Sequence, residues 1–127
     1  CSPEMVAQAL NQLGPIPIVL AHMGGWKNWD RVADHLAPTG CCIDTALSLG
    51  AVCPLDDSRC DPEELLLLEE NAFCELVRAF GSRRVLFGTD YPMWAADKEL
   101  ATLLSMHFSE EEFRKILWDN AYNLFVK

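Results

Sequence analysis

The sequence predicts an α/β fold in which parallel strands alternate with helices. Two short apolar runs, Ile16–Ala21 and Val85–Thr89, lack the alternation of a half-exposed strand, which is typical of strands buried on both faces. Segments with apolar residues at helical spacing flank both runs. Half of the 127 residues are apolar, enough for one hydrophobic core. Since no stretch resembles a linker, we expect residues 1–127 to form part of one domain.

The expected helices begin at recognisable capping signals. Ser2-Pro3-Glu4 starts a helix that ends at Gly14, and Asp61-Pro62 starts one that we expect to run unbroken to Gly81. Ser109 and Glu112 have the spacing of a capping box for a last helix. Four further segments complete the prediction: helices around Trp29–Leu36 and Leu100–Leu104, a weaker strand at Cys41–Thr45, and a loop from Gly50 to Cys60.

Charge and composition exclude several classes of partner. The net charge of -9 disfavours binding to nucleic acids and to anionic membranes. No apolar run approaches the roughly 20 residues that span a bilayer, and neither end resembles an export signal. With a core of this size the six cysteines are not needed as disulfides, so we expect reduced thiols and a cytoplasmic location. A structural zinc site from Cys41, Cys53 and Cys60 is the alternative.

Two polar residues follow the two apolar strands in the same way. His22 comes after Ile18–Ala21 and precedes Gly24-Gly25, and Asp90 comes after Leu86–Thr89. The carboxyl ends of parallel strands meet at one edge of the sheet, where α/β folds bind their ligands. An imidazole and a carboxylate there suit a divalent metal ion and its water. The alternatives are a structural histidine and a turn aspartate.

The same motifs resemble those of the amidohydrolase-related family, which includes aminocarboxymuconate-semialdehyde decarboxylase and related decarboxylases and hydrolases of aromatic acids. The resemblance covers nearly the whole chain and follows the order of the family's motifs. It rests on four segments: Ala21–Gly25 followed by Trp29-Asp30, Cys42–Thr45, Arg84–Pro92, and Glu111 to Leu124 with Asn120-Ala121.

This resemblance implies a partial (β/α)8 barrel, about strands 6 to 8 with their helices. It implies that Asp90 is a metal ligand and that His22 either acts in acid/base catalysis or contacts a second metal. The expected cofactor is a divalent ion, zinc with manganese as the alternative. The expected reaction is hydrolysis or decarboxylation of a small carboxylate, lactone or amide. Trp26 and Trp94 follow two of these motifs, so we expect them to line the substrate pocket, with packing under loops as the alternative role. Asp44, near the end of the weaker strand, could help to orient the site through hydrogen bonds.

The family's other metal ligands have no counterpart among the three histidines of this chain. His35 falls inside an expected helix and His107 between two helices. A complete barrel needs about 250 residues, so we expect the chain, which begins with Cys1, to be the carboxyl-terminal part of a longer one. Most metal ligands would then come from the missing amino-terminal half of the barrel.

Two other functions stay open at the level of the sequence. A non-catalytic half-barrel would expose sheet edges and interior side chains, so it would form a homo-oligomer or bind a partner. A flavodoxin-like nucleotide-binding protein is the second alternative. It lacks support because no glycine-rich phosphate loop follows a strand at a suitable spacing.

Overall fold

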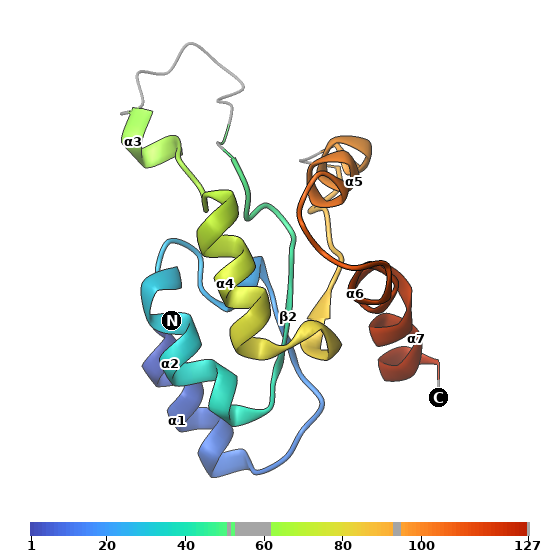
Figure 1. Ribbon diagram of the computed structural model, residues 1–127. Coiled ribbons are helices and arrows are strands. Elements are labelled where there is room, and N and C mark those ends of the chain that lie inside the picture. The colour runs from blue at the N-terminus through green and yellow to red at the C-terminus, as the bar shows by residue number, and fades with distance from the viewer. Residues whose placement is uncertain (51, 53–61, 93–94, 127) are drawn as a thin grey trace.

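A parallel three-stranded sheet lies at the centre of the computed structural model, which describes residues 1–50, 52, 62–92 and 95–126 (Figure 1). The strand order is β1 (Val19–Leu20), β2 (Cys42–Asp44), β3 (Val85–Leu86). β2 is the central strand; Leu20 pairs with Ile43, and Ile43 pairs with Val85. The predicted parallel α/β arrangement is confirmed, with each strand shorter than the apolar run that predicted it.

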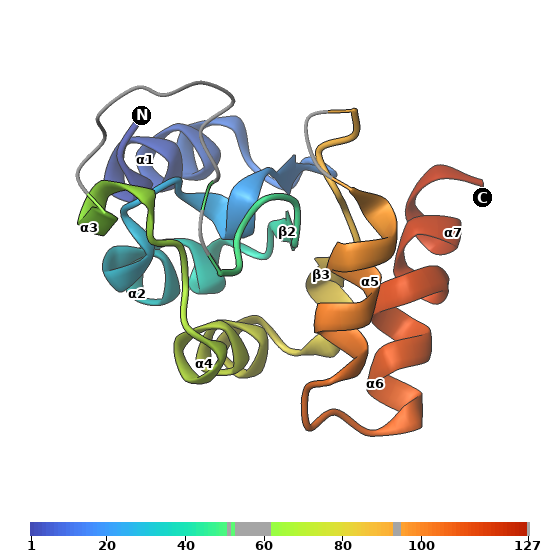
Figure 2. The same cartoon turned by 90° about the horizontal axis from the view of Figure 1, so that it is seen from above.

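Helices flank this sheet on two sides. In both views α1, α2 and α4 gather on one side of β2, whereas α5, α6 and α7 lie on the other side, beyond β3 (Figures 1 and 2). A π-helical segment, Lys115–Asp119, joins α6 to α7. The bounds are α1 Pro3–Leu13, α2 Val32–Leu36, α3 Pro62–Leu65, α4 Glu70–Phe80, α5 Ala96–Leu104, α6 Glu110–Arg114 and α7 Asn120–Phe125.

The expected single helix from Asp61 to Gly81 is wrong. The structure has two helices, α3 and α4, separated by an extended segment. Leu68 forms an isolated parallel bridge with Leu49, and its N–H donates to the Ser48 carbonyl oxygen at 3.0 Å. This pairing outcompetes the continuation of the helix. The expected cap Asp61, and most of the expected loop from Gly50 to Cys60, lie outside the described residues.

Two predicted helix starts are confirmed by their hydrogen bonds. The Ser2 hydroxyl accepts from the Met5 N–H at 3.4 Å, with Pro3 in the first turn. Ser109 and Glu112 form both bonds of the capping box. Local side-chain chemistry therefore sets these two boundaries.

The core lies between the sheet and α1, α2 and α4. Ile43 and Val85 are fully buried in it, whereas Cys42 and Asp44, on either side of Ile43, are only half-buried. Since alternate residues of a strand face opposite ways, Asp44 projects from the sheet face that these helices leave uncovered. Several of the buried side chains come from these helices, among them Leu10, Leu36, Phe73, Leu76, Val77 and Phe80.

Several expectations about single residues can be compared with the described part of the chain. His35 lies in α2 and His107 lies between α5 and α6, as expected. Cys1, Cys41, Cys42 and Cys74 are free thiols. Cys53 and Cys60, needed for the alternative zinc site, lie outside the described residues. Within the described ranges, no helix has the length and apolarity to cross a membrane.

Candidate active site at the carboxyl ends of the strands

His22 and Asp90 both leave the sheet through a left-handed backbone conformation. Their φ angles are 56° and 60°, and Met23 and Gly24 continue the left-handed path after His22 at 53° and 83°. Such a conformation costs a non-glycine residue roughly 1–2 kcal/mol and persists only where the surroundings enforce it. The fully buried Met23 side chain supplies one such anchor. The chain therefore maintains a strained exit that turns His22 away from the strand direction.

The imidazole of His22 has a defined hydrogen-bonding arrangement. Its Nδ1 lies 2.9 Å from the carbonyl oxygen of Ala46. A carbonyl oxygen can only accept, so Nδ1 must carry the hydrogen. In the neutral ring Nε2 then has a free lone pair, which can take a proton or bind a metal ion.

Asp44, at the end of β2, holds the backbone on both sides of this contact. Its Oδ1 accepts from the His22 N–H at 3.0 Å and from the Ala46 N–H at 3.1 Å. Burial raises the pKa of the Asp44 carboxyl; the two N–H groups and the His22 ring lower it, and the nearby Asp90 charge adds to the rise. The Asp90 carboxylate is thus electrostatically coupled to the residue that binds His22.

Thr45 links β2 to the segment that carries Asp90. Its hydroxyl donates to the Gly88 carbonyl oxygen at 3.1 Å, and its oxygen accepts from the Gly88 N–H at 3.0 Å. A Cβ on Gly88 would lie 3.2 Å from the Ala46 Cβ and 3.5 Å from the Asp44 Cγ. The missing side chain lets this segment pass close to the end of β2, two residues before Asp90.

Two tryptophans lie beside His22. The Trp26 ring meets the imidazole edge to face with centroids 5.4 Å apart, and 39% of Trp26 is exposed. Trp29 contacts Trp26 at 5.9 Å, and its indole N–H donates to the His22 carbonyl oxygen at 2.8 Å. Trp26 thus forms a partly open aromatic wall beside the imidazole. Trp94, the other expected pocket residue, lies outside the described residues.

The described residues do not make a complete metal site. His22 and Asp90 offer donor types that suit a divalent ion, but a stable site needs three or four donors. In the ranges that the structure describes, no group of three histidine, cysteine, aspartate or glutamate residues could hold an ion.

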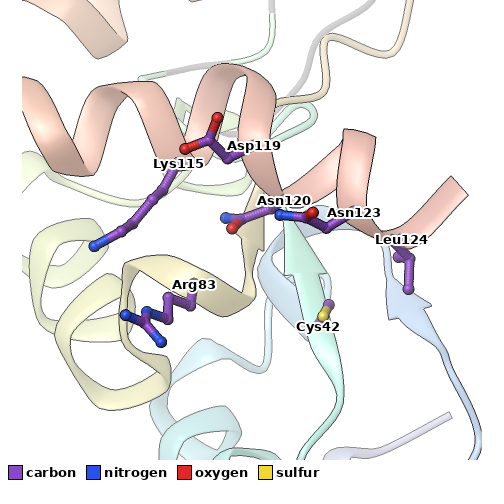
Figure 3. Close-up of a pocket in the computed structure, with 7 residues that line it drawn as sticks. All are labelled: Cys42, Arg83, Lys115, Asp119, Asn120, Asn123 and Leu124. Atoms are coloured by element: carbon purple, nitrogen blue, oxygen red, sulfur yellow. The ribbon is translucent and has the colours of Figure 1, made fainter. Parts of the chain in front are cut away.

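A separate cavity lies at the amino ends of the strands (Figure 3). It has a volume of about 430 Å³, and β2 and the last helix both contribute to its walls. The Cys42 side chain, from the start of β2, projects into it opposite Asn120 and Asn123. Because parallel strands run the same way, this cavity lies at the end opposite to His22. It is lined by Cys42, Arg83, Lys115, Asp119, Asn120, Asn123 and Leu124.

Sequence reasoning missed part of the candidate site. It singled out His22, Asp90 and Trp26, and it expected hydrogen bonding from Asp44. It gave no role to Thr45, to Gly88 or to the Ala46 carbonyl oxygen. A backbone oxygen has no signature in sequence, whereas the polar pair Asp44-Thr45 at the end of an apolar strand could have drawn attention to Thr45.

Residues 3–126 match the family model described as amidohydrolase. The chain belongs to the amidohydrolase family. No protein with a curated description matches the sequence. The family membership agrees with the motifs around His22 and Asp90.

Solved structures of three bacterial proteins resemble the fold. An uncharacterised TIM-barrel protein from Bordetella bronchiseptica has a TM-score of 0.72 at 20% identity, over 98% of this chain and 39% of its own. A zinc-bound amidohydrolase from Burkholderia multivorans has a TM-score of 0.68 at 15% identity, over 95% and 48%. A dihydroxybenzoic acid decarboxylase from Polaromonas sp. JS666, with bound manganese and the inhibitor 2-nitroresorcinol, has a TM-score of 0.56 at 19% identity, over 87% and 33%.

These matches define the fold as part of a (β/α)8 barrel. The chain spans less than half the length of each of the three proteins. The sheet face that carries Asp44 therefore corresponds to the interior side of the barrel, and the helices to its outer ring.

Proposed function

We propose that this chain is the carboxyl-terminal part of a metal-dependent hydrolase or decarboxylase acting on a small carboxylate, lactone or amide. The observation that carries the proposal is the hydrogen bond from His22 Nδ1 to the Ala46 carbonyl oxygen, which leaves Nε2 of the neutral ring with a free lone pair. His22 follows β1 and Asp90 follows β3, at the carboxyl edge of the sheet. TIM-barrel enzymes carry their catalytic groups at this edge. Family membership supports the same class of chemistry.

In the proposed reaction His22 transfers protons through Nε2. The Nδ1–H···O=C bond stabilises the imidazolium when Nε2 takes up a proton, and proton transfer of this kind contributes ~10²–10⁴-fold to a rate. Asp90 would hold a divalent ion together with ligands from outside the described residues. When bound, that ion supplies an activated water and polarises the substrate. Trp26 would bind the substrate through the exposed part of its side chain.

The proposal also includes the source of the other metal ligands, the metal ion and the compartment. The remaining metal ligands would come from the other half of the barrel, since the chain spans 33–48% of the barrels that it resembles. Zinc and manganese are both candidates, because each is bound in a protein of similar fold. The four cysteines in the described part of the chain are free thiols, which supports a reducing compartment such as the cytoplasm.

The test compares three variants of the full-length protein. Dihydroxybenzoates assayed for CO₂ release and lactones or amides assayed for acid release serve as substrates, and metal content is measured by mass spectrometry. We expect Asp90→Asn to lose both metal and activity, and His22→Ala to lose activity. His107→Ala is the matched control, because its side chain is 96% exposed and far along the chain from the site. Unchanged turnover in both site variants would disprove the proposal.

A second candidate function is a non-catalytic half-barrel that associates with itself or with a partner. The last helix favours it, because Trp118, Tyr122 and Phe125 are 66%, 49% and 71% exposed and recur at helical spacing. Trp118 stacks on Tyr122, and with Leu117, Ala121, Phe125 and Val126 they line a shallow apolar groove of about 360 Å³. Light scattering would distinguish the candidates, since a monomer at micromolar concentration contradicts self-association.

A further inference from the structure

Two consecutive side chains at the end of β2 bind the segments that leave the two neighbouring strands. Asp44 contacts the segment after β1, and Thr45 contacts the segment after β3. The described ladder between β2 and β3 pairs residues only as far as Asp44 and Leu86. Beyond that point these side chains replace the backbone pairing that would otherwise hold the three strand ends together.

Asp44 closes a ring of hydrogen bonds around His22. One carboxylate oxygen, Oδ1, accepts from the backbone N–H of His22 and from that of Ala46. The carbonyl oxygen of Ala46 in turn accepts from Nδ1 of the His22 ring. The same atom thus fixes where the His22 backbone lies and where the acceptor for its ring lies. A displacement of either would break the Nδ1 bond, which selects the tautomer.

Thr45 binds the segment after β3 through its single hydroxyl. It is 2% exposed, and its oxygen both donates to and accepts from the backbone of Gly88. Its own N–H donates to the Leu86 carbonyl oxygen at 3.0 Å. Because water has little access to Thr45, solvent cannot replace these bonds. Gly88 is therefore held against β2, and Asp90 follows two residues later.

We propose that Asp44 and Thr45 are positioning residues that hold His22 and Asp90 at one edge of the sheet, Asp44 by selecting the Nδ1–H tautomer of His22. The proposal rests on the function proposed for His22 and Asp90. It assigns the effect of Asp44 to hydrogen-bond acceptance and not to its charge. Asp44→Asn, which retains the Oδ1 acceptor, should therefore keep the positioning role of Asp44. Asp44→Leu, with a side chain of similar size, should lose it.

The decisive measurement is the tautomer of His22 in the full-length protein. Long-range ¹H–¹⁵N NMR spectra, assigned with His22→Gln and recorded at a pH high enough to give the neutral imidazole, report which nitrogen carries the hydrogen. We expect the Nδ1–H form in the wild type and in Asp44→Asn, and a mixture of both forms in Asp44→Leu. An Nε2–H form in the wild type would overturn the proposal even if no variant folds.

Ser48→Ala is the matched control for the tautomer. The Ser48 hydroxyl donates to the same Ala46 carbonyl oxygen at 2.9 Å, but it has no bond to Asp44 among those described. We expect this variant to keep the Nδ1–H form. A pure Nδ1–H form in Asp44→Leu would refute the role of Asp44, because the tautomer would then not depend on it.

Steady-state kinetics of the Asp44 and Thr45 variants test the same proposal through kcat and KM. Removing a group that orients a catalytic residue typically costs about 10- to 100-fold in activity, and we expect Asp44→Leu and Thr45→Val to lose this much in kcat with little change in KM. Asp44→Asn and Thr45→Ser, which keep the bonding oxygen, should recover most of the loss. Equal losses in Thr45→Val and Thr45→Ser would contradict positioning by the hydroxyl.

The two proposals fail in distinguishable ways. If His22→Ala and Asp90→Asn both keep full activity while the wild type shows the Nδ1–H tautomer, the proposed function fails and the hydrogen-bond ring stands. If His22→Ala is inactive while Asp44→Leu keeps the tautomer, the proposed function stands and positioning by Asp44 fails.

Discussion

The indole N–H of Trp29 donates to the carbonyl oxygen of His22 at 2.8 Å, so a side chain seven residues away secures the strained exit from β1. We expect Trp29→Phe to destabilise the protein by about 1 kcal/mol, because the ring remains while one hydrogen bond is lost. Urea denaturation measures this change. Trp118→Phe is the control: Trp118 is 66% exposed, and we expect a change within about 0.5 kcal/mol. Equal effects in both variants would refute the anchoring role of Trp29.

Trp26 should affect substrate binding more than turnover. Its ring lies 5.4 Å from the His22 imidazole and is partly open to solvent. An aromatic contact of this kind contributes about 0.5–1.5 kcal/mol, so we expect Trp26→Ala to raise KM by up to about tenfold with kcat largely kept. Trp26→Phe should restore KM. Steady-state kinetics on the full-length enzyme would contradict this role if kcat falls and KM does not change.

Asn120, the first residue of α7, connects this helix to β3 through hydrogen bonds. Its Nδ2 donates to the carbonyl oxygens of Ser82 at 2.7 Å and Val85 at 2.6 Å. Asn120→Ala leaves both carbonyl groups without this donor, and we expect a loss of about 2–4 kcal/mol. Asn120→Asp should be worse, since a carboxylate would face two carbonyl oxygens. The matched control is Asn123→Ala, because Asn123 is exposed. Urea denaturation measures both variants. If the urea midpoint of Asn120→Ala is no lower than that of Asn123→Ala, the two hydrogen bonds of Asn120 do not hold the last helix on β3.

The sequence was informative wherever a residue's role depends on local chemistry. The helix caps at Ser2 and Ser109 and the parallel arrangement of the strands are confirmed, because a hydroxyl at a helix start and an unbroken apolar run act over a few residues. The helix expected from Asp61 failed where a tertiary contact, the pairing of Leu68 with Leu49, overrode helical spacing. The bond between His22 and the Ala46 carbonyl oxygen could not be predicted, because it joins two backbone turns 24 residues apart.

The capping box of the last helix predicts a specific dependence on pH. Bonds from the Ser109 N–H and hydroxyl, both at 2.8 Å, hold the pKa of Glu112 below its ordinary value. A lowered pKa in the folded state gives a stabilisation that is present above the unfolded pKa of ~4.3 and is lost as pH falls through the folded value. The advantage of the wild type over Glu112→Gln should therefore shrink between about pH 5 and pH 3.

Urea denaturation at several pH values checks this prediction for Glu112. Glu110→Gln, on the same exposed turn, is the control for removing one negative charge outside the capping box. A constant difference between wild type and Glu112→Gln across this range would mean that the ionised carboxylate contributes nothing to the cap.

Gly24 and Gly40 form a matched pair that separates steric crowding from backbone strain. Both have left-handed φ angles, 83° and 79°. A Cβ on Gly24 would lie 3.1 Å from the Ile43 Cγ2 and 3.3 Å from Leu36 and Val32 atoms, whereas a Cβ on Gly40 would meet nothing within 4 Å. Gly40→Ala should therefore cost only the conformational term of about 1 kcal/mol, and Gly24→Ala should cost a further 1–3 kcal/mol or so for overpacking.

Gly24→Ala should also disturb the candidate site, because Gly24 ends the left-handed turn that begins at His22. We expect Gly24→Ala to lower kcat and the urea midpoint together, and Gly40→Ala to lower the midpoint alone. If both variants lose the same stability and neither loses activity, the close packing of the turn on Ile43 does not control the placement of His22.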